Sequence, residues 1–388
     1  MTPINKLFHL EGWIDAGATF NGENRNTQFA FQTPQKIKNN FPLKYNDQDQ
    51  TLQMNQLYLI GSHDTKRSRC DWDFGGRIDM LFGTDAYWVA AKGMELDKNG
   101  HARWFPDARR TGDGSLYGFA LPQAYGELNA PIGRGTRIRI GKFYSNMTLD
   151  SAMSRENFFY SRSYALSYSV PTTLFGAIAD TPLSKNVTVK AGLSNGWDKV
   201  NGLYDGIAFI GGISWKSSSG NTSIDFTLIT GSEAPAPDSD NALHDAWRTT
   251  YSLKLQKQLT ARFGYALEHV LGSHRNGAFL ESGNPTDALW YGINQYFIYK
   301  VNNCLNAAAR FEWFQDAKNS RVFPVPGTTG NDYTGLTLGL NWKPKSWFVL
   351  RPEIRWDSSD VKMPILDSGP FRGNNHMFTF AIDALVQF

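Results

Sequence analysis

Charged side chains stand at alternate positions in many short segments of this chain, often with both signs close together. Residues two apart on a β-strand lie on the same face, so each segment would place its charges on one side of a sheet. A wet face tolerates such charges and can attract, repel or orient ions, whereas a dry core would need an ion-pair partner for each of them. The positions are Glu11, Asp15, Arg77, Asp79, Glu127, Arg137, Arg139, Arg262, Glu268, Arg310, Glu312, Arg351, Glu353 and Arg355.

Enzymatic chemistry has little support in the sequence. Gly192-Leu-Ser-Asn-Gly196 matches the G-x-S-x-G pattern of a nucleophile elbow, but it ends an alternating segment and no helical pattern follows it. Asp238-Ser-Asp240 could hold Ca²⁺ in an exposed loop, yet it lacks the spacing of a dedicated calcium loop. HExxH, CxxC and phosphate-loop motifs are not found, and the 7 histidines are scattered. We therefore expect neither an enzyme nor a protein that needs a metal or cofactor.

The elements that would position the charges are β-strands. A sustained helical pattern with caps is not found, whereas about sixteen segments of roughly ten residues alternate with period two. These predicted strands span residues 8–20, 52–61, 71–82, 118–129, 136–143, 172–179, 187–194, 207–215, 222–230, 247–256, 260–271, 288–299, 305–315, 334–342, 347–356 and 376–388.

The last predicted strand shows the alternation most clearly. One face carries Phe378, Phe380 and Ile382, and the other carries Thr379 and Asp383. An unpaired apolar face on a final strand is an aggregation hazard in a soluble protein. In a closed barrel no edge is exposed, and the apolar face meets lipid. A soluble β-sandwich is the alternative interpretation of this segment.

Composition excludes several classes of protein. Aromatic residues make up 14% of the 388-residue chain, and the net charge of +3 gives no case for a nucleic-acid partner. No apolar run approaches the ~20 residues of a spanning helix, which excludes a helical membrane protein but not a barrel. Cys70 and Cys304 are predicted to be separate thiols, because the strand order places them far apart. No secretory signal is visible at residues 1–6, so we expect the mature form of an exported protein.

The lengths of the links between strands favour a membrane barrel. In the second half, short links (residues 216–221, 257–259, 300–304 and 343–346) alternate with long ones (residues 231–246, 272–287, 316–333 and 357–375). A transmembrane barrel has short turns at its periplasmic end and long loops outside, with an even strand number. The even count requires that residues 158–169 belong to a loop. Aromatic residues near strand ends would form the interfacial girdles: Trp215, Trp247, Tyr299, Trp342, Trp347 and Phe388.

Several short motifs resemble those of bacterial outer-membrane porins, specifically the OmpL-like β-barrel porin group. They are Glu11-Gly-Trp-Ile-Asp-Ala-Gly, Trp72-Asp-Phe-Gly-Gly-Arg-Ile-Asp79 with Gly83-Thr-Asp85, Leu121-Pro-Gln-Ala-Tyr125, Phe159-Tyr-Ser-Arg-Ser-Tyr164 with Pro171, Asn195-Gly-Trp197, Arg351-Pro-Glu-Ile-Arg-Trp356 and Pro370-Phe371. The resemblance covers nearly the whole chain, residues 1–388, as a single barrel domain. It implies passive diffusion of small solutes through the outer membrane, and an aromatic assembly signal at Phe388 that the assembly machinery recognises.

The resemblance also implies that the third long loop folds into the lumen, and residues 144–171 are the candidate. Asp150 and Glu156 in this loop would face Arg77, Arg137 and Arg139 across the narrowest point and create a transverse field. The alternative is that these loop charges are merely solvated. Together with Asp79, Arg310, Glu312, Arg351, Glu353 and Arg355, they are the predicted pore-lining and constriction residues, and the excess of arginine favours a mild anion preference.

Three functional hypotheses follow. The leading one is a water-filled channel for small hydrophilic solutes and ions, embedded in outer-membrane lipid and compatible with a homotrimer. The second is a barrel plugged by its long loops, with a structural or ligand-binding role outside the cell. The third, a soluble all-β carbohydrate-binding or hydrolytic protein, predicts solubility without detergent and paired carboxylates in a cleft.

Overall fold

The computed structural model describes residues 8–22, 40–97, 99–105, 116–201, 206–233, 246–280, 282–322, 324, 330–360, 371 and 374–388. Within them, sixteen antiparallel strands form one closed barrel in which sequence neighbours pair and β1 pairs with β16. The predicted transmembrane barrel of sixteen strands is confirmed. The strands are β1 (His9–Asn21), β2 (Thr51–His63), β3 (Asp73–Gly83), β4 (Gly118–Ala130), β5 (Thr136–Tyr144), β6 (Thr173–Pro182), β7 (Val187–Ser194), β8 (Ala208–Lys216), β9 (Thr222–Ser232), β10 (Trp247–Gln258), β11 (Phe263–Phe279), β12 (Pro285–Lys300), β13 (Leu305–Asp316), β14 (Asn331–Lys345), β15 (Phe348–Ser359) and β16 (His376–Gln387).

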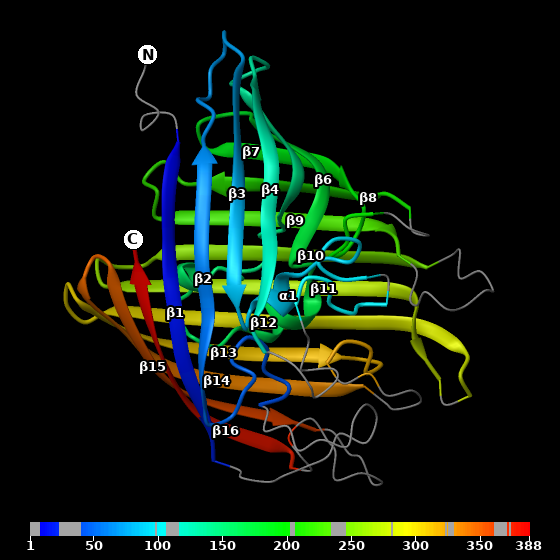
Figure 1. Cartoon of the computed structure of the whole chain (residues 1–388), viewed down its shortest axis with the longest axis vertical. Helices are drawn as coiled ribbons and strands as arrows, with labels where there is room; N and C mark the ends of the chain where they lie inside the picture. The colour runs from blue at the N-terminus through cyan, green and yellow to red at the C-terminus, as the bar shows by residue number, and fades with distance from the viewer. Residues whose placement is uncertain are drawn as a thin grey trace.

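The strands are steeply tilted around the barrel. In Figure 1, β1–β4 run down the front wall while β9–β13 cross behind them at a large angle, as expected for strands that tilt to close a barrel. The main helix outside the β5–β6 connection is the single turn α1 (Ala86–Val89) between β3 and β4. No helix in the described ranges has the length and apolar character to cross a bilayer.

The barrel closes where the first strand meets the last. Ile14 pairs with Val386 and Phe20 with Phe380, and the backbone of Gly12 exchanges two hydrogen bonds with Phe388 at 2.8 and 2.9 Å. The pairing leaves no open sheet edge, which is what a bilayer requires of a β-structure. The role of Phe388 as an assembly signal stays a prediction.

The two faces of β16 point as the alternation predicts, whereas Arg262, expected on an inner face, lies exposed in the link before β11. On β16 the outward Phe378 and Phe380 are exposed, whereas the inward Thr379 and Asp383 are buried. The aromatic residues expected in the girdles also lie on the outside, with exposed fractions of 39–63%: Trp215, Trp247, Tyr299, Trp342, Trp347 and Phe388. The apolar side therefore faces hydrocarbon and not a second sheet.

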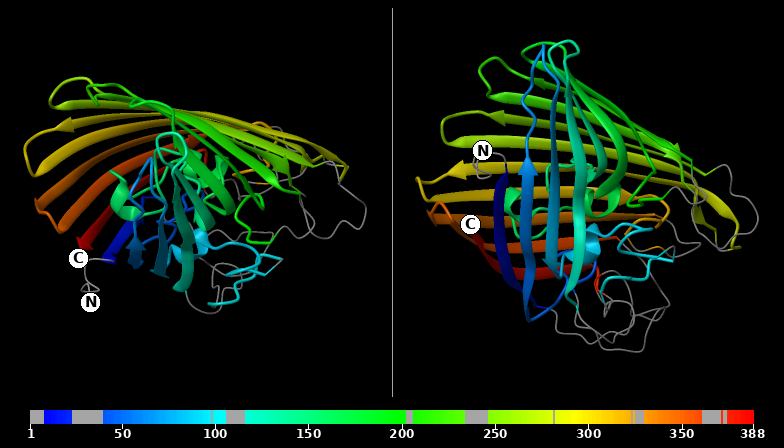
Figure 2. Two further views of the ribbon diagram at one scale, coloured as in Figure 1. Left: turned by 90° about the horizontal axis from the view of Figure 1, so that it is seen from above. Right: turned by 45° about the horizontal axis from the view of Figure 1, so that its top comes forward.

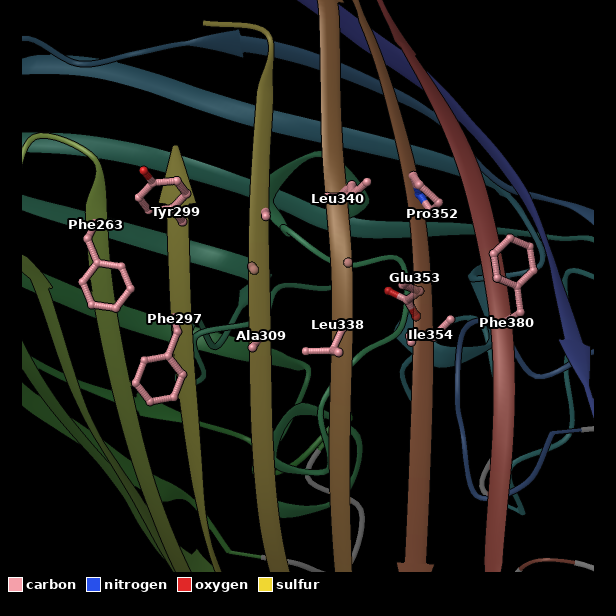
Figure 3. Close-up of a pocket in the computed structure, with 13 residues that line it drawn as sticks. Phe263, Phe297, Tyr299, Ala309, Leu338, Leu340, Pro352, Glu353, Ile354 and Phe380 are labelled. Carbon is pink, nitrogen blue, oxygen red and sulfur yellow. The ribbon is translucent and has the colours of Figure 1, made fainter. Parts of the chain in front are cut away.

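The outer surface of β11–β16 carries a shallow apolar groove (Figure 3). Its floor is formed by the small side chains of Ala307 and Ala309, and its sides by Phe297, Leu338 and other outward residues. Glu353 also borders the groove, although its buried side chain lies on the interior face of β15. This wall is shaped for contact with acyl chains.

The link pattern and the cysteines also agree with the sequence. Short links join β2 to β3, β12 to β13 and β14 to β15, and residues 158–169 form no strand, so the even count holds. Cys70 and Cys304 are exposed free thiols in two different short links, so the prediction of separate thiols is confirmed. The Asp238-Ser-Asp240 motif and Pro370 lie outside the described residues.

A substitution on β10 tests the direction of the two faces. Leu253 is outward and 42% exposed in the middle of the strand, whereas Lys254 points inward at the next position. We expect Leu253→Lys to destabilise the barrel by roughly 2–4 kcal/mol, because it places a charge in hydrocarbon. The control Lys254→Leu should cost much less. Unfolding in lipid vesicles, followed by tryptophan emission, measures both; equal costs would contradict the assignment of faces.

Candidate functional site

The connection between β5 and β6, residues 145–172, lies inside the barrel. It contains η2 (Ser154–Glu156) and the π-helical turn η3 (Ala165–Ser169), and most of its side chains are buried. Both views of Figure 2 show its helical turns between the opposite walls. Burial raises the pKa of Tyr160 and of Tyr164, so both hydroxyls stay protonated and donate to Asn55 at 2.8 Å and Asp357 at 2.9 Å. This is the segment that the resemblance to porins assigned to the lumen.

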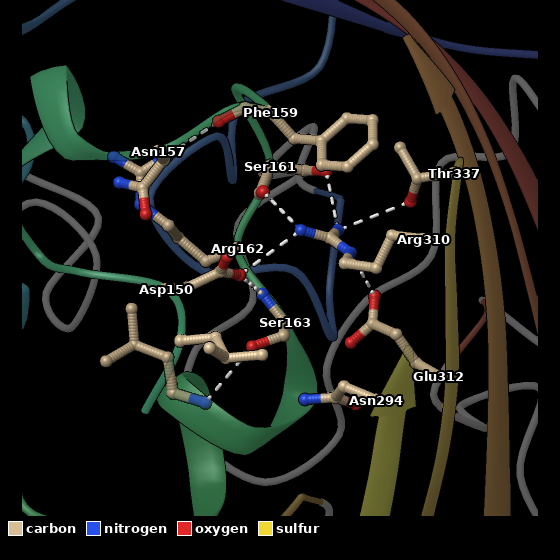
Figure 4. A network of polar contacts seen from close by, with 12 residues as sticks. Asp150, Asn157, Phe159, Ser161, Arg162, Ser163, Asn294, Arg310, Glu312 and Thr337 are labelled. Carbon is tan, nitrogen blue, oxygen red and sulfur yellow. Dashed lines mark hydrogen bonds and ion pairs between the residues drawn. The ribbon is translucent and has the colours of Figure 1, made fainter. Parts of the chain in front are cut away.

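Three wall arginines bind this loop through its backbone. Arg310 projects from β13, and Arg351 and Arg355 project from β15. Figure 4 shows Arg310 at the centre of these contacts, between the loop and the wall. Guanidinium groups suit the task because they donate several hydrogen bonds in a fixed plane. The acceptors, at 2.7 to 3.0 Å, are the carbonyls of Ser154, Asn157, Ser161 and Arg162.

Wall glutamates bind the amide groups of the same loop. Glu268 on β11, Glu312 on β13 and Glu353 on β15 each accept at least one backbone N–H. The donors, at 2.7 to 3.1 Å, are the amides of Leu149, Tyr160, Ser161 and Tyr164. Alternating cations and carboxylates on the wall thus satisfy backbone groups of a loop that has only short helical turns of its own.

These wall charges are covered by the loop and do not meet open water. Arg310 and Glu312 are 0% exposed, and Arg351, Glu353 and Arg355 are 1–3% exposed. Buried charges persist only when they are paired. The pairs lie within the wall: Arg310 with Glu312 at 2.9 Å, Arg355 with Asp357 at 2.7 Å, and Arg351 with Asp383.

Asp150 lies against a different wall from the one that the sequence suggested. Its carboxylate accepts from the Tyr296 hydroxyl at 2.9 Å, from Arg310 at 3.2 Å and from the Ser163 amide at 2.7 Å. The expectation that Asp150 faces Arg77, Arg137 and Arg139 is therefore wrong. The β5–β6 loop extends to the wall formed by β12 and β13. No pattern in the sequence predicts this direction.

The three arginines on the other side of the lumen have acidic partners of their own. Arg77 and Asp79 are 2.6 Å apart, Arg137 and Glu127 are 3.1 Å apart, and Arg139 and Asp180 are 2.9 Å apart. Their side chains remain 21–30% exposed, so this part of the wall is less covered than the β13–β15 side. Glu156 is exposed on the loop. The role of all these residues as pore lining remains a proposal.

Two lysines on the less covered wall were missed by the sequence reading. Lys190 of β7 and Lys254 of β10 point inward, and within the described residues neither forms an ion pair. Lys190 donates to the Thr227 hydroxyl at 3.3 Å, passing over Gly212, where a side chain would crowd it. Lys254 donates to the Asn146 carbonyl at 2.9 Å. Alternation places both lysines on the inner faces of their strands. Neither has a charged residue two positions away that would mark it as part of a charge cluster.

Lys44, in the connection between β1 and β2, is half-buried where several long connections meet. Its ammonium nitrogen lies 4.3 Å from the ring centre of Tyr168 and 5.3 Å from that of Trp88. Burial and the neighbouring Arg321 guanidinium lower the pKa of Lys44 from 10.5 to about 7, although the Asp198 carboxylate acts in the opposite direction. The protonated form of Lys44 therefore destabilises the folded barrel.

The stability of the barrel should therefore depend on pH through Lys44. Because its pKa is about 7 when folded and 10.5 ordinarily, the unfolded chain binds more protons between these values. Stability should rise with pH across that window, by up to about 1.4 kcal/mol per pH unit, and stay lowest below pH 7. Lys44→Met should remove this slope, whereas the exposed Lys300→Met should keep it. Urea unfolding in micelles at several pH values measures the slope; an unchanged slope in Lys44→Met would contradict the assignment.

Comparison with known protein families shows to which family the chain belongs. Residues 7–388 match the model of the family described as "Putative beta-barrel porin-2, OmpL-like". The chain belongs to this porin family. As the family and the fold indicate, the porin forms an outer-membrane channel for passive diffusion of solutes. No curated protein sequence matches it significantly.

Solved structures show the same fold at low sequence identity. The outer-membrane channel DcaP of Acinetobacter baumannii is 12% identical with a TM-score of 0.58, covering 98% of the porin and 97% of that chain. An anion-selective porin from Comamonas acidovorans is 11% identical with a TM-score of 0.59, covering 98% and 99%. OmpT of Vibrio cholerae, in a form described as a trimer, is 11% identical with a TM-score of 0.57, also covering 98% and 99%.

Proposed function

We propose that this porin conducts small anions in preference to cations, through the part of the lumen beside β5–β10. The observation that carries the proposal is the pair of inward lysines, Lys190 and Lys254, neither of which forms an ion pair with a described residue. The nearby Arg139 is neutralised by Asp180. Asp225 on β9 and Glu268 on β11 both stand opposite Lys254 in the strand register. Glu268 is buried against the β5–β6 loop, so Asp225 is the carboxylate that shares the less covered lumen with the two lysines.

The size of the preference follows from the distance between a lysine and a passing ion. In water, a unit charge about 8 Å from the ion's path changes the ion's energy by about 0.5 kcal/mol, or roughly twofold in occupancy. Because each lysine raises the occupancy of anions and lowers that of cations, it changes the ratio of the two by about fourfold. Salt screens charges at this distance, so the preference should weaken as ionic strength rises.

Reversal potentials in planar bilayers test this proposal. Under a KCl gradient, the wild-type porin should show an anion preference that is larger at low salt. Replacing both Lys190 and Lys254 with glutamine should reduce the anion-to-cation permeability ratio by about fourfold for each lysine, because each lysine changes the occupancy of both ions. Lys300→Gln, on an exposed lysine at the end of β12, is the matched control. A ratio that the double substitution leaves unchanged would refute the proposal.

The plugged barrel is the competing candidate, and the dense contacts of the β5–β6 loop favour it. Polar contacts between wall side chains and loop backbone run from Glu268 on β11 to Arg355 on β15. A barrel sealed by this loop would give no steady current at any salt concentration. An open channel gives unitary current steps, so single-channel recording separates the two functions.

We propose further that the porin assembles as a homotrimer and has no catalytic role. The form of OmpT described as a trimer supports the first statement, through similarity of fold alone. Light scattering of the detergent-purified porin, corrected for bound detergent, would give the mass of one chain or of three. A monomer under mild extraction would count against assembly.

A further inference from the structure

Arg321, in the connection between β13 and β14, is held between two tryptophans at the long-loop end of the barrel. The guanidinium carbon lies 5.0 Å from the ring centre of Trp197 and 4.8 Å from that of Trp290. The two indoles are perpendicular, with ring centres 6.1 Å apart. Trp290 is fixed in turn, because its Nε1–H donates to the Ser169 carbonyl at 3.1 Å. The orientation of the guanidinium plane is therefore set by packing.

Among the described residues, one acceptor contacts the donors of this guanidinium. Nε–H donates to the Tyr168 carbonyl at 2.7 Å, which directs the opposite edge of the group away from the β5–β6 loop. In the described part of the chain, no hydrogen bond or ion pair involves Nη1 or Nη2 of Arg321. Neither atom is among the buried polar atoms that lack a partner, so both can reach solvent. The edge formed by Nη1 and Nη2, which can bind a carboxylate, therefore makes no hydrogen bond with the described residues.

Two other cationic side chains, Lys44 and Arg248, interact electrostatically with Arg321. Burial and the Arg248 guanidinium lower the pKa of Arg321 to about 10, although the Asp316, Asp198 and Glu233 carboxylates act in the opposite direction. Burial and Arg321 in turn lower the pKa of Lys44. Arg248 stacks on Trp197, with its guanidinium carbon 4.6 Å from the ring centre. An anion that entered here would relieve this repulsion.

The carboxylates nearby are engaged by other groups. Asp198 accepts from the backbone amides of Thr172 and Thr173 at 3.0 and 2.7 Å. Asp316 accepts from the amides of residues 320–322 at 2.7 to 2.9 Å and so closes its own turn. Glu233 pairs with Lys199 at 2.9 Å. These contacts leave the free edge of Arg321 to an external ligand.

We propose that Arg321 binds the carboxylate of a small organic anion at the outer mouth of the porin. The two free amino groups of one guanidinium match the two coplanar oxygens of a carboxylate, a geometry that a lysine cannot provide. The inference deepens the proposed anion preference, because it names a ligand class, but it depends on other residues than Lys190 and Lys254.

Calorimetric titration of the detergent-purified porin with sodium benzoate tests the site, with uncharged benzyl alcohol as the matched probe. Benzoate should bind the wild type, and benzyl alcohol should not. Arg321→Gln should weaken benzoate binding by about tenfold or more, because it removes charge-assisted hydrogen bonds. Arg321→Lys should also weaken binding, because it keeps the charge without the fork. Lys318→Gln, an exposed lysine on the same connection, should leave it unchanged.

Benzoate binding that is absent in the wild type, or equal in wild type and Arg321→Gln, would overturn the proposal. If Arg321→Gln does not fold, as judged by heat-dependent gel mobility, equal affinity of Arg321→Lys and wild type overturns it instead. The doubly substituted Lys190→Gln, Lys254→Gln porin should still bind benzoate after losing its ion preference. Failure of the mouth site and failure of the proposed ion selectivity are therefore distinguishable.

Discussion

Replacing Arg351 with methionine is expected to destabilise the barrel by about 3–5 kcal/mol, because it leaves buried carboxylates without their cation. Arg351 is 2% exposed, pairs with Asp383, and lies 3.7 Å from Asp15. Both carboxylate oxygens of Asp15 are buried, and neither accepts a hydrogen bond. The Asp383 carboxylate would then be buried beside Asp15 without its cation. The midpoint of urea unfolding in micelles measures the loss.

A compensated variant separates loss of charge balance from loss of packing. Combining Arg351→Met with Asp15→Asn and Asp383→Asn removes all three charges, and replacing a whole buried ion cluster is often close to neutral. We expect the triple variant to recover most of the lost stability. A single Arg351→Met variant that unfolds at the wild-type urea concentration would show that the wall does not depend on this cation.

The sequence predicts the strands well because each depends on a local pattern. Lipid on one side and polar groups on the other force period-two alternation, which single segments display without reference to their partners. The largest boundary error is at the end of β11, predicted at Leu271 but found at Phe279. Beyond Leu271 the segment reads Gly-Ser-His-Arg-Asn-Gly, which has no apolar face. There the strand is held by pairing with β12, which the sequence of β11 alone does not encode.

The candidate site was only half predictable, for a physical reason. Alternation places Arg310, Glu312 and Arg355 on the inner face, and the structure agrees. Their partners, however, are mostly backbone carbonyls and amides of the loop, groups that every residue carries. No residue type marks such a contact in advance. The sequence therefore indicated which charges point inward but not which of them the loop would cover.

The same limit explains why Arg321 was missed. Its environment is assembled from connections that are far apart in the chain, since Trp197 precedes β8 and Trp290 lies in β12. A motif search examines residues that are close in sequence. Sites built from loop tips become visible only when the barrel brings those loops to one rim.

Removing the β5–β6 loop should produce the largest change in conductance. The backbone of Ser145 donates to the Thr172 carbonyl at 3.0 Å, so a short glycine-containing link can replace residues 146–170 without moving the strands. The barrel should still fold, because Arg310 and Arg355 keep wall partners in Glu312 and Asp357 at 2.9 and 2.7 Å. Those charges would then meet water, which lowers the cost of leaving the loop's hydrogen bonds unmade.

Single-channel conductance of this loopless variant should therefore rise several-fold, and the charged β11–β15 wall should become part of the pore. The outcome also bears on the plugged-barrel candidate. If the wild type carries no current and the loopless variant does, the loop is a plug; if both conduct and the variant conducts more, it is a constriction. Arg310→Gln removes hydrogen bonds between the wall and the loop but keeps the loop itself. It should give a noisier current than the wild type at similar mean conductance. Equal conductance with and without the loop would show that the loop lies outside the ion path, and the burial of the wall arginines would then serve stability alone.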